Sequence, residues 1–418
     1  EHLIEINGQT VNGCLSLTWT YSGEQYQAQT IEELAGNYRQ QLEQLIEHCS
    51  GFYGYTPSDF PLSQLKQTQL DQLAQSYGEN IADIYPLSPM QEGMLFHSMY
   101  APESGVYFEQ IHFCLNGQLN IEAFLKAWQH LIGRHTILRT AFLHETDRPL
   151  QLVYKKAKLS CQMLDWSELS ESDRRQELES LLTTERDHGF KLNEAPLMRM
   201  QVIRESDTKF RLVWHHHHLL MDGWSLPVFF TELFELYSGF VEGNSPSLAP
   251  VPPYKSYIKW LSEQDREKAK EYWQEQLEGF LAPTPLPMPI AQYREDQAQY
   301  QELALKLDVQ LSQELKQFGR QHRLTLNTIV QGAWAALLSR YSGESEVVFG
   351  VTMSGRQVPV TGIDRMLGLF INTLPLRVKV ENNGPDHDLL GGLQTIQQRQ
   401  QQNNQNAYAA LSDIQDWS

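Results

Sequence analysis

The chain has 418 residues, of which 41% are hydrophobic and 20% charged, as in an ordinary soluble globular protein. Its formal net charge of −18 argues against a nucleic-acid partner, which would normally require a basic face. Its four cysteines are far apart, and no apolar run reaches the roughly 18 residues that span a bilayer.

These properties predict a reduced, cytoplasmic protein without a disulfide framework or a membrane segment. The chain starts EHLIEING, which is acidic and polar and lacks an initiator methionine. This start indicates no signal peptide, and we expect the sequence to be an excised piece of a longer protein.

The first 80 residues hold few predicted elements. Residues 13–21 alternate as a strand does, and residues 30–49 have helical periodicity. A strand and a helix cannot bury a core by themselves, so we expect residues 1–50 to be the tail of a missing domain or an arm packed on the rest. Turn-forming residues and a Gln-rich stretch predict a linker over residues 51–80, with a short helix possible there.

From residue 81 onward the composition is that of a mixed α/β domain. Proline-rich segments at 245–254 and 282–290 interrupt the chain, and we interpret this section as the crossover between two lobes. The sequence thus predicts an N-terminal lobe over 81–250 and a C-terminal lobe over 251–418.

The two predicted lobes resemble each other in the order of their elements. In the first, a helix over residues 121–135 precedes the strand LRTAFL. In the second, the alternating leucines of LALKLDV, from residue 303, predict a strand that leads into a helix. A largely buried helix capped by Thr325 follows over 325–341, and then an apolar strand over 346–355.

Four consecutive histidines in the stretch RLVWHHHHLLMDGWS are the strongest chemical signal. If the strand FRLVW continues through them, His215 and His217 lie on one face and His216 and His218 on the other. Two histidines of one face plus Asp222 could bind zinc, but no HExxH or distant Cys/His pair supports such a site. An affinity tag is out of place inside a core strand, and histidines without a chemical role are a further alternative.

A catalytic role is the remaining interpretation of the tract. Histidine has an ordinary pKa of about 6.5 and can act as acid or base near neutrality. Gly223, directly after Asp222, leaves room for a substrate to approach the backbone. The sequence has no GxSxG nucleophile elbow, P-loop or GxGxxG motif. A histidine without a covalent partner suggests direct transfer between two bound substrates.

Five segments together resemble the condensation-domain superfamily of nonribosomal peptide synthetases, which is related in fold to chloramphenicol acetyltransferase. In chain order they are YPLSPMQEGMLFH (85–97), RHTILRTAF (134–142), HHLLMDG (217–223), YKSYIKWL (254–261) and LGLFINTLPLR (367–377). The third segment matches HHxxxDG, the hallmark of the superfamily. The resemblance covers residues 81–418 and implies an α/β (α+β) fold of two chloramphenicol-acetyltransferase-like lobes, a V-shaped pseudo-dimer. We expect the second lobe to be truncated at its C-terminus.

The residues before this region resemble another domain of the same synthetases. GCLSLTWTYS, the helix after it and YTPSDFPL (55–62) are similar to the C-terminal end of an epimerization domain and its linker. That order implies a condensation domain that accepts a D-configured donor, and the segments PMQEGMLFH and HHLLMDGWSLP resemble the D-to-L subclass. The extra His-rich motif of dual epimerization/condensation domains is not seen between residues 81 and 110.

The resemblance implies an acyltransferase-type enzyme that forms peptide bonds in antibiotic or other secondary metabolite biosynthesis. Its substrates would be held as thioesters on the phosphopantetheine arms of upstream and downstream carrier proteins, with no cofactor bound permanently. Adjacent adenylation and epimerization domains would be further partners, and neither nucleic acid nor a membrane is expected. The alternatives are a coenzyme A-dependent acyltransferase of the same superfamily and a non-catalytic module that docks carrier proteins.

The resemblance also assigns the site residues. His218, the second histidine of the motif, would be catalytic, and His217 would support it. Asp222 would be structural, because a buried carboxylate needs an arginine partner, and we expect Arg139 rather than Arg134.

Three further positions belong to the expected site or its surroundings. Gly223 would line the tunnel through which the substrates enter. Asn372 matches a family position near the site, or it is simply a turn residue that closes the strand of LFINT. Trp224 is expected in the core.

Overall fold

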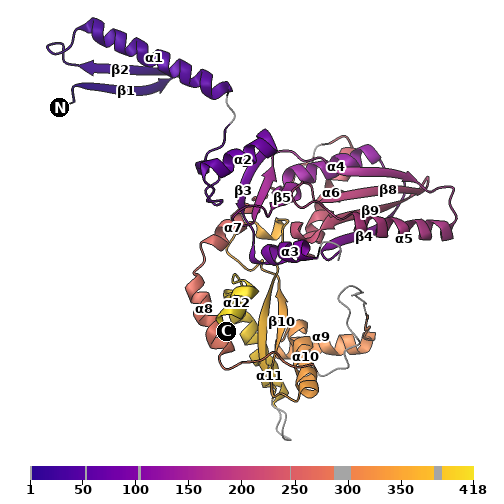
Figure 1. The fold of residues 1–418 in the computed structure, drawn as a ribbon. Helices are drawn as coiled ribbons and strands as arrows, with labels where there is room; N and C mark the ends of the chain where they lie inside the picture. Colours follow the sequence, from indigo (N-terminus) through magenta and orange to yellow (C-terminus); the bar gives the residue numbers. More distant parts are fainter. Residues whose placement is uncertain (1, 52–53, 102–104, 245, 287–302, 381–387) are drawn as a thin grey trace. The chain divides into compact units, whose positions relative to one another are not determined.

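The computed structural model describes residues 2–51, 54–101, 105–244, 246–286, 303–380 and 388–418 (Figure 1). It divides into two compact units. One comprises Glu1–Asp59 and Gln64–Glu79, and the other comprises Phe60–Ser63 and Asn80–Ser418.

The first unit is built from a β-hairpin and helices. The hairpin turns at Asn12 and Gly13, which both have positive φ, as an Asn-Gly turn of this type requires. Trp19 of the hairpin meets Tyr38 of the long helix edge to face, with ring centroids 5.6 Å apart. The elements are β1 (Ile4–Val11), β2 (Cys14–Tyr21), α1 (Ala28–Gly51), η1 (Pro57–Asp59) and α2 (Gln67–Tyr77), with η2 (Gly78–Asn80) leading out of the unit.

Sequence reasoning found most but not all of this unit. The strand expected at 13–21 is β2, the helix expected at 30–49 is α1, and the short helix within 51–80 is α2. Strand β1 was missed, because its exposed, polar residues do not alternate clearly between apolar and polar.

The second unit begins with a three-stranded antiparallel sheet in the order β3-β6-β5. Helix α3 follows β3 and is capped by Ser88, whose hydroxyl accepts the N–H of Gln91. The elements are β3 (Ile81–Pro86), α3 (Pro89–Tyr100), η4 (Thr136–Arg139), β5 (Thr140–Leu143) and β6 (Leu150–Tyr154).

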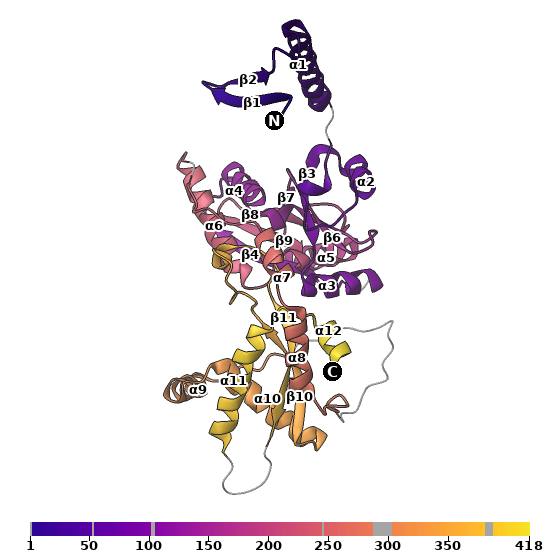
Figure 2. The ribbon, with the colours of Figure 1, turned by 90° about the vertical axis from the view of Figure 1, so that its left-hand side faces the viewer.

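A four-stranded sheet in the order β4-β9-β8-β7 forms the centre of the first lobe. All its pairs are antiparallel except β7 with β8. Helices α4 and α6 lie beside each other along this sheet (Figures 1 and 2). The elements are β4 (Phe108–Asn116), α4 (Ile121–Arg134), β7 (Ser160–Asp165), α5 (Glu171–His188), β8 (Met198–Ser206), β9 (Lys209–His217), η5 (His218–Leu220) and α6 (Ser225–Val241).

The two faces of this sheet pack against different helices. Trp214 of β9 faces α4 and α6, where its ring lies 5.2 Å from that of Trp128 and 4.6 Å from that of Phe229. Its neighbour Val213 belongs to the opposite face and packs with leucines of α5, among them Leu178. Strand alternation therefore sorts the residues of β9 between two helix layers.

The second lobe has an antiparallel hairpin of β10 and β11 as its sheet. One cluster of apolar side chains joins the hairpin to α10 and α11, and another joins it to α8 and α12. The elements are α7 (Lys255–Ser262), α8 (Arg266–Leu277), α9 (Val309–His322), α10 (Leu326–Ser342), β10 (Glu346–Met353), η7 (Ile363–Arg365), β11 (Asn372–Lys379), α11 (Leu389–Gln405) and α12 (Leu411–Trp417).

Two expectations for this lobe are wrong. Residues 303–308 form no strand, and Leu303 and Leu305 are 99% and 85% exposed, because within the described residues no strand pairs with them. Helix α10 is capped by Thr325 as expected, but it is not largely buried. Its outer face is exposed at five apolar positions, which we call the α10 stripe: Leu326, Val330, Trp334, Leu337 and Tyr341.

Candidate active site

Strand β9 carries the first three histidines and separates them between its two faces. His216 shares a face with Trp214, on which its ring stacks at a centroid distance of 4.5 Å. His215 and His217 alternate with these two residues and therefore lie on the opposite face, as predicted. His218 does not continue the alternation, because the strand ends at His217 and η5 begins at His218.

His215 is a structural residue whose two ring nitrogens are both occupied. The side-chain amide of Gln110 lies 3.2 Å from Nδ1, and the side-chain carbonyl oxygen of Gln201 lies 2.9 Å from Nε2. An amide donor at Nδ1 leaves the proton on Nε2, so the ring is neutral. Burial lowers the pKa of His215 to about 4, which agrees with this assignment.

His217 uses its ring to hold the turn that follows the strand. Its Nδ1 accepts the backbone N–H of Leu219 at 3.1 Å. Its Nε2 lies 3.4 Å from the hydroxyl of Ser98, which itself donates to the carbonyl of Met94. Nε2 is therefore the protonated nitrogen of a neutral ring. Burial lowers the pKa values of both His217 and His216 to about 3.

His218 differs from the other three histidines. Its backbone N–H donates to the carbonyl of Tyr107 at 2.9 Å, and its own carbonyl accepts the N–H of Met221 at 3.2 Å. The imidazole stands edge-on to the ring of Tyr107 at a centroid distance of 6.4 Å. The ring is only partly buried, and its Nδ1 has no hydrogen-bond partner among the described residues. Of the tract, this is the imidazole that is available to a substrate.

Asp222 is fully buried and acts as an anchor. Its Oδ2 accepts the N–H of Phe370 at 2.9 Å, and its Oδ1 accepts the N–H and the hydroxyl of Ser225 at 3.1 and 3.2 Å. Its backbone N–H donates to Gly368 at 3.1 Å. The guanidinium of Arg356 lies 3.5 Å from Oδ1. The carboxylate therefore joins the motif of the first lobe to the LGLF segment of the second.

The expected ion pair between Asp222 and Arg139 or Arg134 is wrong. Arg139 donates to the carbonyl of Tyr154 at 2.7 Å, and Arg134 forms a bidentate pair with Glu232 at 2.9 and 3.0 Å. Both guanidinium groups find acceptors within the first lobe. The carboxylate instead faces the second lobe, which supplies its cationic partner.

That partner, Arg356, is itself held firmly. Its Nη1 donates to the carbonyls of Ile363 and Met366 at 2.6 and 3.0 Å. Its guanidinium lies 4.3 Å from the centroid of the Phe370 ring, close enough for a cation–π contact. Burial lowers the pKa of Arg356, and the nearby Asp222 carboxylate opposes this effect.

The two residues after Asp222 lie at the surface. A Cβ at Gly223 would meet no atom within 4 Å, so there is open space beside it, and its role in lining a tunnel stays a prediction. Trp224 is 53% exposed, so the expectation that it belongs to the core is wrong. The inward face of α6 is formed by later residues such as Phe229 and Leu233.

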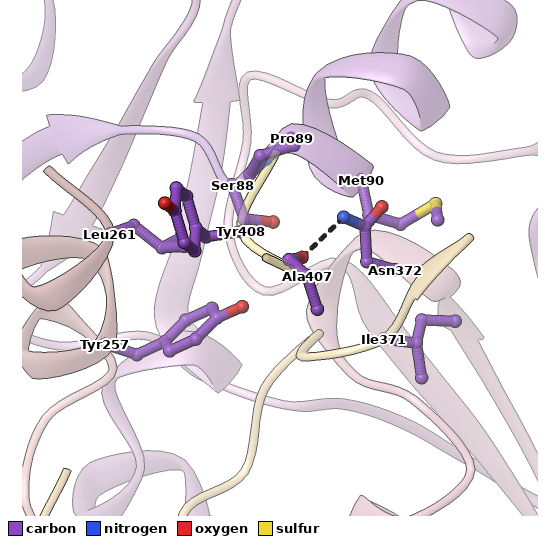
Figure 3. Close-up of a pocket in the computed structure, with 9 residues that line it drawn as sticks. All are labelled: Ser88, Pro89, Met90, Tyr257, Leu261, Ile371, Asn372, Ala407 and Tyr408. Carbon is purple, nitrogen blue, oxygen red and sulfur yellow. Dashed lines mark hydrogen bonds between the residues drawn. The ribbon is translucent and has the colours of Figure 1, made fainter. Parts of the chain in front are cut away.

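Asn372 lines a pocket together with residues from several segments (Figure 3). Its amide donates to the carbonyls of Ala407 and Ala409 at 2.8 and 2.7 Å. Because it is the first residue of β11, it does not close a strand. None of these hydrogen bonds goes to the histidine tract. The other lining residues are Ser88, Pro89, Met90, Tyr257, Leu261, Ile371, Ala407 and Tyr408.

Among the described residues, no group of three or more His, Cys, Asp or Glu side chains could hold a metal ion. The histidine rings lie on different faces, whereas a zinc site needs ligands that converge on one point. Within the same residues, no helix has both the length and the apolar character needed to cross a membrane.

Sequence reasoning missed Tyr107 and Arg356. Tyr107 precedes β4, and only the pairing of β4 with β9 brings it beside the tract. Arg356 follows β10 in the turn SGRQ and reaches Asp222 across the lobes. The arginine after glycine in SGRQ was the available signal, but local periodicity does not report which distant carboxylate an arginine meets.

A family model described as the condensation domain matches residues 81–418. The chain is 41% identical over 420 residues to one of the linear gramicidin synthase proteins of Brevibacillus parabrevis, covering 100% of this chain and 8% of that relative. It is 42% identical over 386 residues to a mycosubtilin synthase protein of Bacillus subtilis, covering 90% of this chain and 15% of the relative. The chain thus spans a small part of these relatives. It belongs to the condensation-domain family of nonribosomal peptide synthetases.

Solved structures agree on the fold. The X-domain complex with OxyB from teicoplanin biosynthesis matches with a TM-score of 0.67 at 22% identity, covering 81% of this chain and 73% of that one. The first condensation domain of the calcium-dependent antibiotic synthetase matches with a TM-score of 0.64 at 18% identity, covering 80% and 78%. The predicted fold class, an α/β chain with chloramphenicol-acetyltransferase-like lobes, is confirmed.

Proposed function

We propose that this chain catalyses peptide-bond formation between two substrates held on carrier proteins. The donor is an aminoacyl or peptidyl thioester on an upstream phosphopantetheine arm, and the acceptor is the amine of a downstream aminoacyl thioester. Family membership supports the reaction class, and the relatives are synthases of linear gramicidin and mycosubtilin. The observation that carries the proposal is the partly exposed His218, whose imidazole no hydrogen bond ties to the described residues.

In the proposed reaction, the neutral amine attacks the thioester carbon and a tetrahedral intermediate forms. When this intermediate collapses, the new C–N bond is kept, the C–S bond to the upstream arm breaks, and the arm leaves as a protonated thiol. The imidazole of His218 hydrogen-bonds the attacking amine, accepts its proton as the intermediate forms, and returns that proton to the departing thiolate. His217 and Asp222 do not touch the substrates, because their polar atoms already hold the turn around the motif.

Magnitudes favour positioning as the main contribution of His218. An α-amine has a pKa of about 7.7–8.0, so a useful fraction is already neutral near pH 7. Alignment of two reactants can lower a barrier by roughly 7–11 kcal/mol. General base catalysis typically contributes about 10²–10⁴-fold, which is a smaller effect.

We further propose that the donor is D-configured and that residues 1–50 are the end of an epimerization domain. The segments GCLSLTWTYS and YTPSDFPL support this, as does the alignment with the gramicidin synthase relative over the whole chain. Adjacent adenylation and epimerization domains, together with both carrier proteins, are the partners that this arrangement requires.

The test is a condensation assay with two loaded carrier proteins and a panel of D- and L-aminoacyl donors. It compares the chain with His218→Ala and with His112→Ala, a control at an exposed histidine of β4. We expect product from D donors with the chain and the control, and a loss of about 10²-fold or more in His218→Ala. Circular dichroism establishes that each variant is folded.

Other outcomes would contradict parts of the proposal. Equal turnover by His218→Ala would exclude His218 as the catalytic residue. Turnover of L donors alone would exclude the D-to-L assignment. Carrier binding without product, in the folded chain, would point to a docking module, and product from an acyl-coenzyme A donor alone would point to the coenzyme A-dependent alternative.

A further inference from the structure

The turn before β4 holds Tyr107 in an unfavourable backbone conformation. Phe108 donates its N–H to Gly105 at 3.2 Å and closes the turn. Gly105 and Tyr107 both have left-handed φ values, +61° and +70°. Glycine adopts this region without penalty, but a bulky side chain rarely does. Such strain persists only where the surrounding structure enforces it, and it is common at functional sites.

Helix α5 keeps this turn in place. A Cβ built on Gly105 would lie 3.0 and 3.1 Å from Cγ and Cδ of Arg186, so the aliphatic part of that arginine covers the turn closely. Its guanidinium donates to the side chain of Gln110 at 2.7 Å. Gln110 in turn contacts the ring of His215. The turn is therefore packed near the face of the sheet that carries His215 and His217.

Tyr107 meets both motif histidines. Its ring lies 6.4 Å from the rings of His217 and His218, tilted at 49° to the first and at 84° to the second. Its carbonyl accepts the N–H of His218, one residue beyond the last paired residues of β4 and β9. This bond lies where β9 ends and η5 begins.

The two histidines differ in what fixes their rings. The ring of His217 is fixed at both nitrogens, by Leu219 and Ser98. The ring of His218 has no such bond within the described residues, and its buried Nδ1 has no partner there. A reactive imidazole is normally oriented through a hydrogen bond at its second nitrogen. In this structure, edge-on packing against the ring of Tyr107 is the contact that can orient the His218 imidazole instead.

We propose that Tyr107 is a positioning residue for condensation, whose ring fixes the orientation of the His218 imidazole. The inference rests on the function proposed above. It explains why a residue with left-handed backbone carries a large aromatic side chain, where glycine or asparagine would fit the turn with less strain.

The experiment compares Tyr107→Gly, Tyr107→Asn and Tyr107→Phe with a matched control, Arg323→Gly. Arg323 caps α9 with a φ of +58° in the second lobe, so this control relieves the same kind of strain away from the tract. Three quantities are measured: the midpoint of thermal unfolding, kcat and KM for condensation, and the imidazole signals of His218 in NMR spectra, assigned with His218→Ala.

We expect Tyr107→Gly and Tyr107→Asn to unfold close to the temperature of the unchanged chain, because relief of the left-handed strain offsets the lost packing of the partly buried ring. Their kcat should fall about tenfold to a hundredfold, as for a misplaced reacting group. KM should stay within about twofold, because substrate binding is not the step affected. The His218 signals should move in these two variants. Tyr107→Phe, which keeps the ring, and Arg323→Gly should resemble the chain in kcat and in these signals.

Several results would overturn the inference. Unchanged kcat in Tyr107→Gly would do so, and so would a loss in Tyr107→Phe as large as in Tyr107→Gly, because the ring would then not be responsible. Parallel losses of unfolding temperature and kcat in every Tyr107 variant would assign it a purely structural role. If the unchanged chain formed no peptide bond, the function proposed above would fail. The NMR signals would still test the positioning role. Unchanged His218 signals in Tyr107→Gly would refute it, and displaced signals would support it.

Discussion

Helices α4 and α10 carry the same Ala-Trp pair but differ in what covers it. In α4, Trp128 is completely buried and contacts the rings of Phe124, Trp214 and Phe229. In α10, Trp334 is 42% exposed and belongs to the α10 stripe. Helix α4 lies beside α6 on one face of the four-stranded sheet, whereas the described neighbours of α10 are α9, α11 and the β10–β11 hairpin. The same Ala-Trp pair is therefore buried in one helix and exposed in the other, because elements distant in the sequence decide what covers it.

The largest expected effect is at the buried member of this pair. Trp128→Ala should lower the free energy of unfolding by about 3–5 kcal/mol, because it removes a large side chain from a packed core and leaves a cavity. Chemical denaturation followed by far-UV circular dichroism measures the change. A loss below about 1 kcal/mol would mean that the core around α4 collapses to refill the space.

The next effect concerns the contact that joins the two lobes. Asp222 and Arg356 are both largely buried, so removing either leaves a polar partner without compensation. In a double-mutant cycle with Asp222→Asn and Arg356→Ala, we expect a coupling of about 0.5–3 kcal/mol. Asp222→Asn with Arg139→Ala is the control and should be additive within about 0.5 kcal/mol. Coupling to Arg139 instead would contradict the observed pairing.

A smaller effect concerns how acid changes the stability contributed by the histidine-bearing strand β9 of the first lobe. Burial lowers the pKa of His216 to about 3, whereas an unfolded histidine titrates near 6.5. Above about pH 6.5 the ring is neutral in both states, and its contribution to the free energy of unfolding is fully present. As the pH falls from about 6.5 to 3 this contribution is lost, because the unfolded chain binds the proton first. Strands β10 and β11 carry no histidine.

His216→Phe should therefore reduce the loss of stability on acidification. The measurement is the denaturation midpoint of the chain and of the variant at about pH 7 and pH 5, on either side of the unfolded pKa. The difference between the two pH values should be smaller in the variant. His112→Ala, at an exposed histidine, is the control and should leave that difference unchanged. An equal acid response in His216→Phe would show that this ring is not kept neutral by burial.

Local sequence patterns predicted the elements that carry the site, but not their partners. Alternation in FRLVW placed His215 and His217 on one face of β9, and Thr325 correctly marked the start of α10. The same kind of alternation failed at residues 303–308, where the described chain offers no paired strand. Periodicity reports which face of an element is apolar, whereas pairing depends on the rest of the fold.

The errors at the site have the same physical origin. The family resemblance suggested Arg139 as the partner of Asp222, but its guanidinium donates to the backbone carbonyl of Tyr154. Trp224 is apolar, but α6 begins directly after it and turns other residues inward. Tyr107 and Arg356 contribute through a backbone conformation and a contact between lobes, and neither leaves a periodic signal in the sequence.

The smallest expected effect is at the exposed member of the Ala-Trp pair. Trp334→Gln should change the free energy of unfolding by no more than about 0.5 kcal/mol, because an exposed side chain loses little contact area. It should also reduce self-association, because the α10 stripe presents apolar surface to solvent. Denaturation and sedimentation, each at several protein concentrations, measure both quantities. A destabilisation comparable to that of Trp128→Ala would mean that the α10 stripe is covered in solution. In that case, a loss that grows with protein concentration would assign the cover to a second molecule, and a constant loss would assign it to the chain itself.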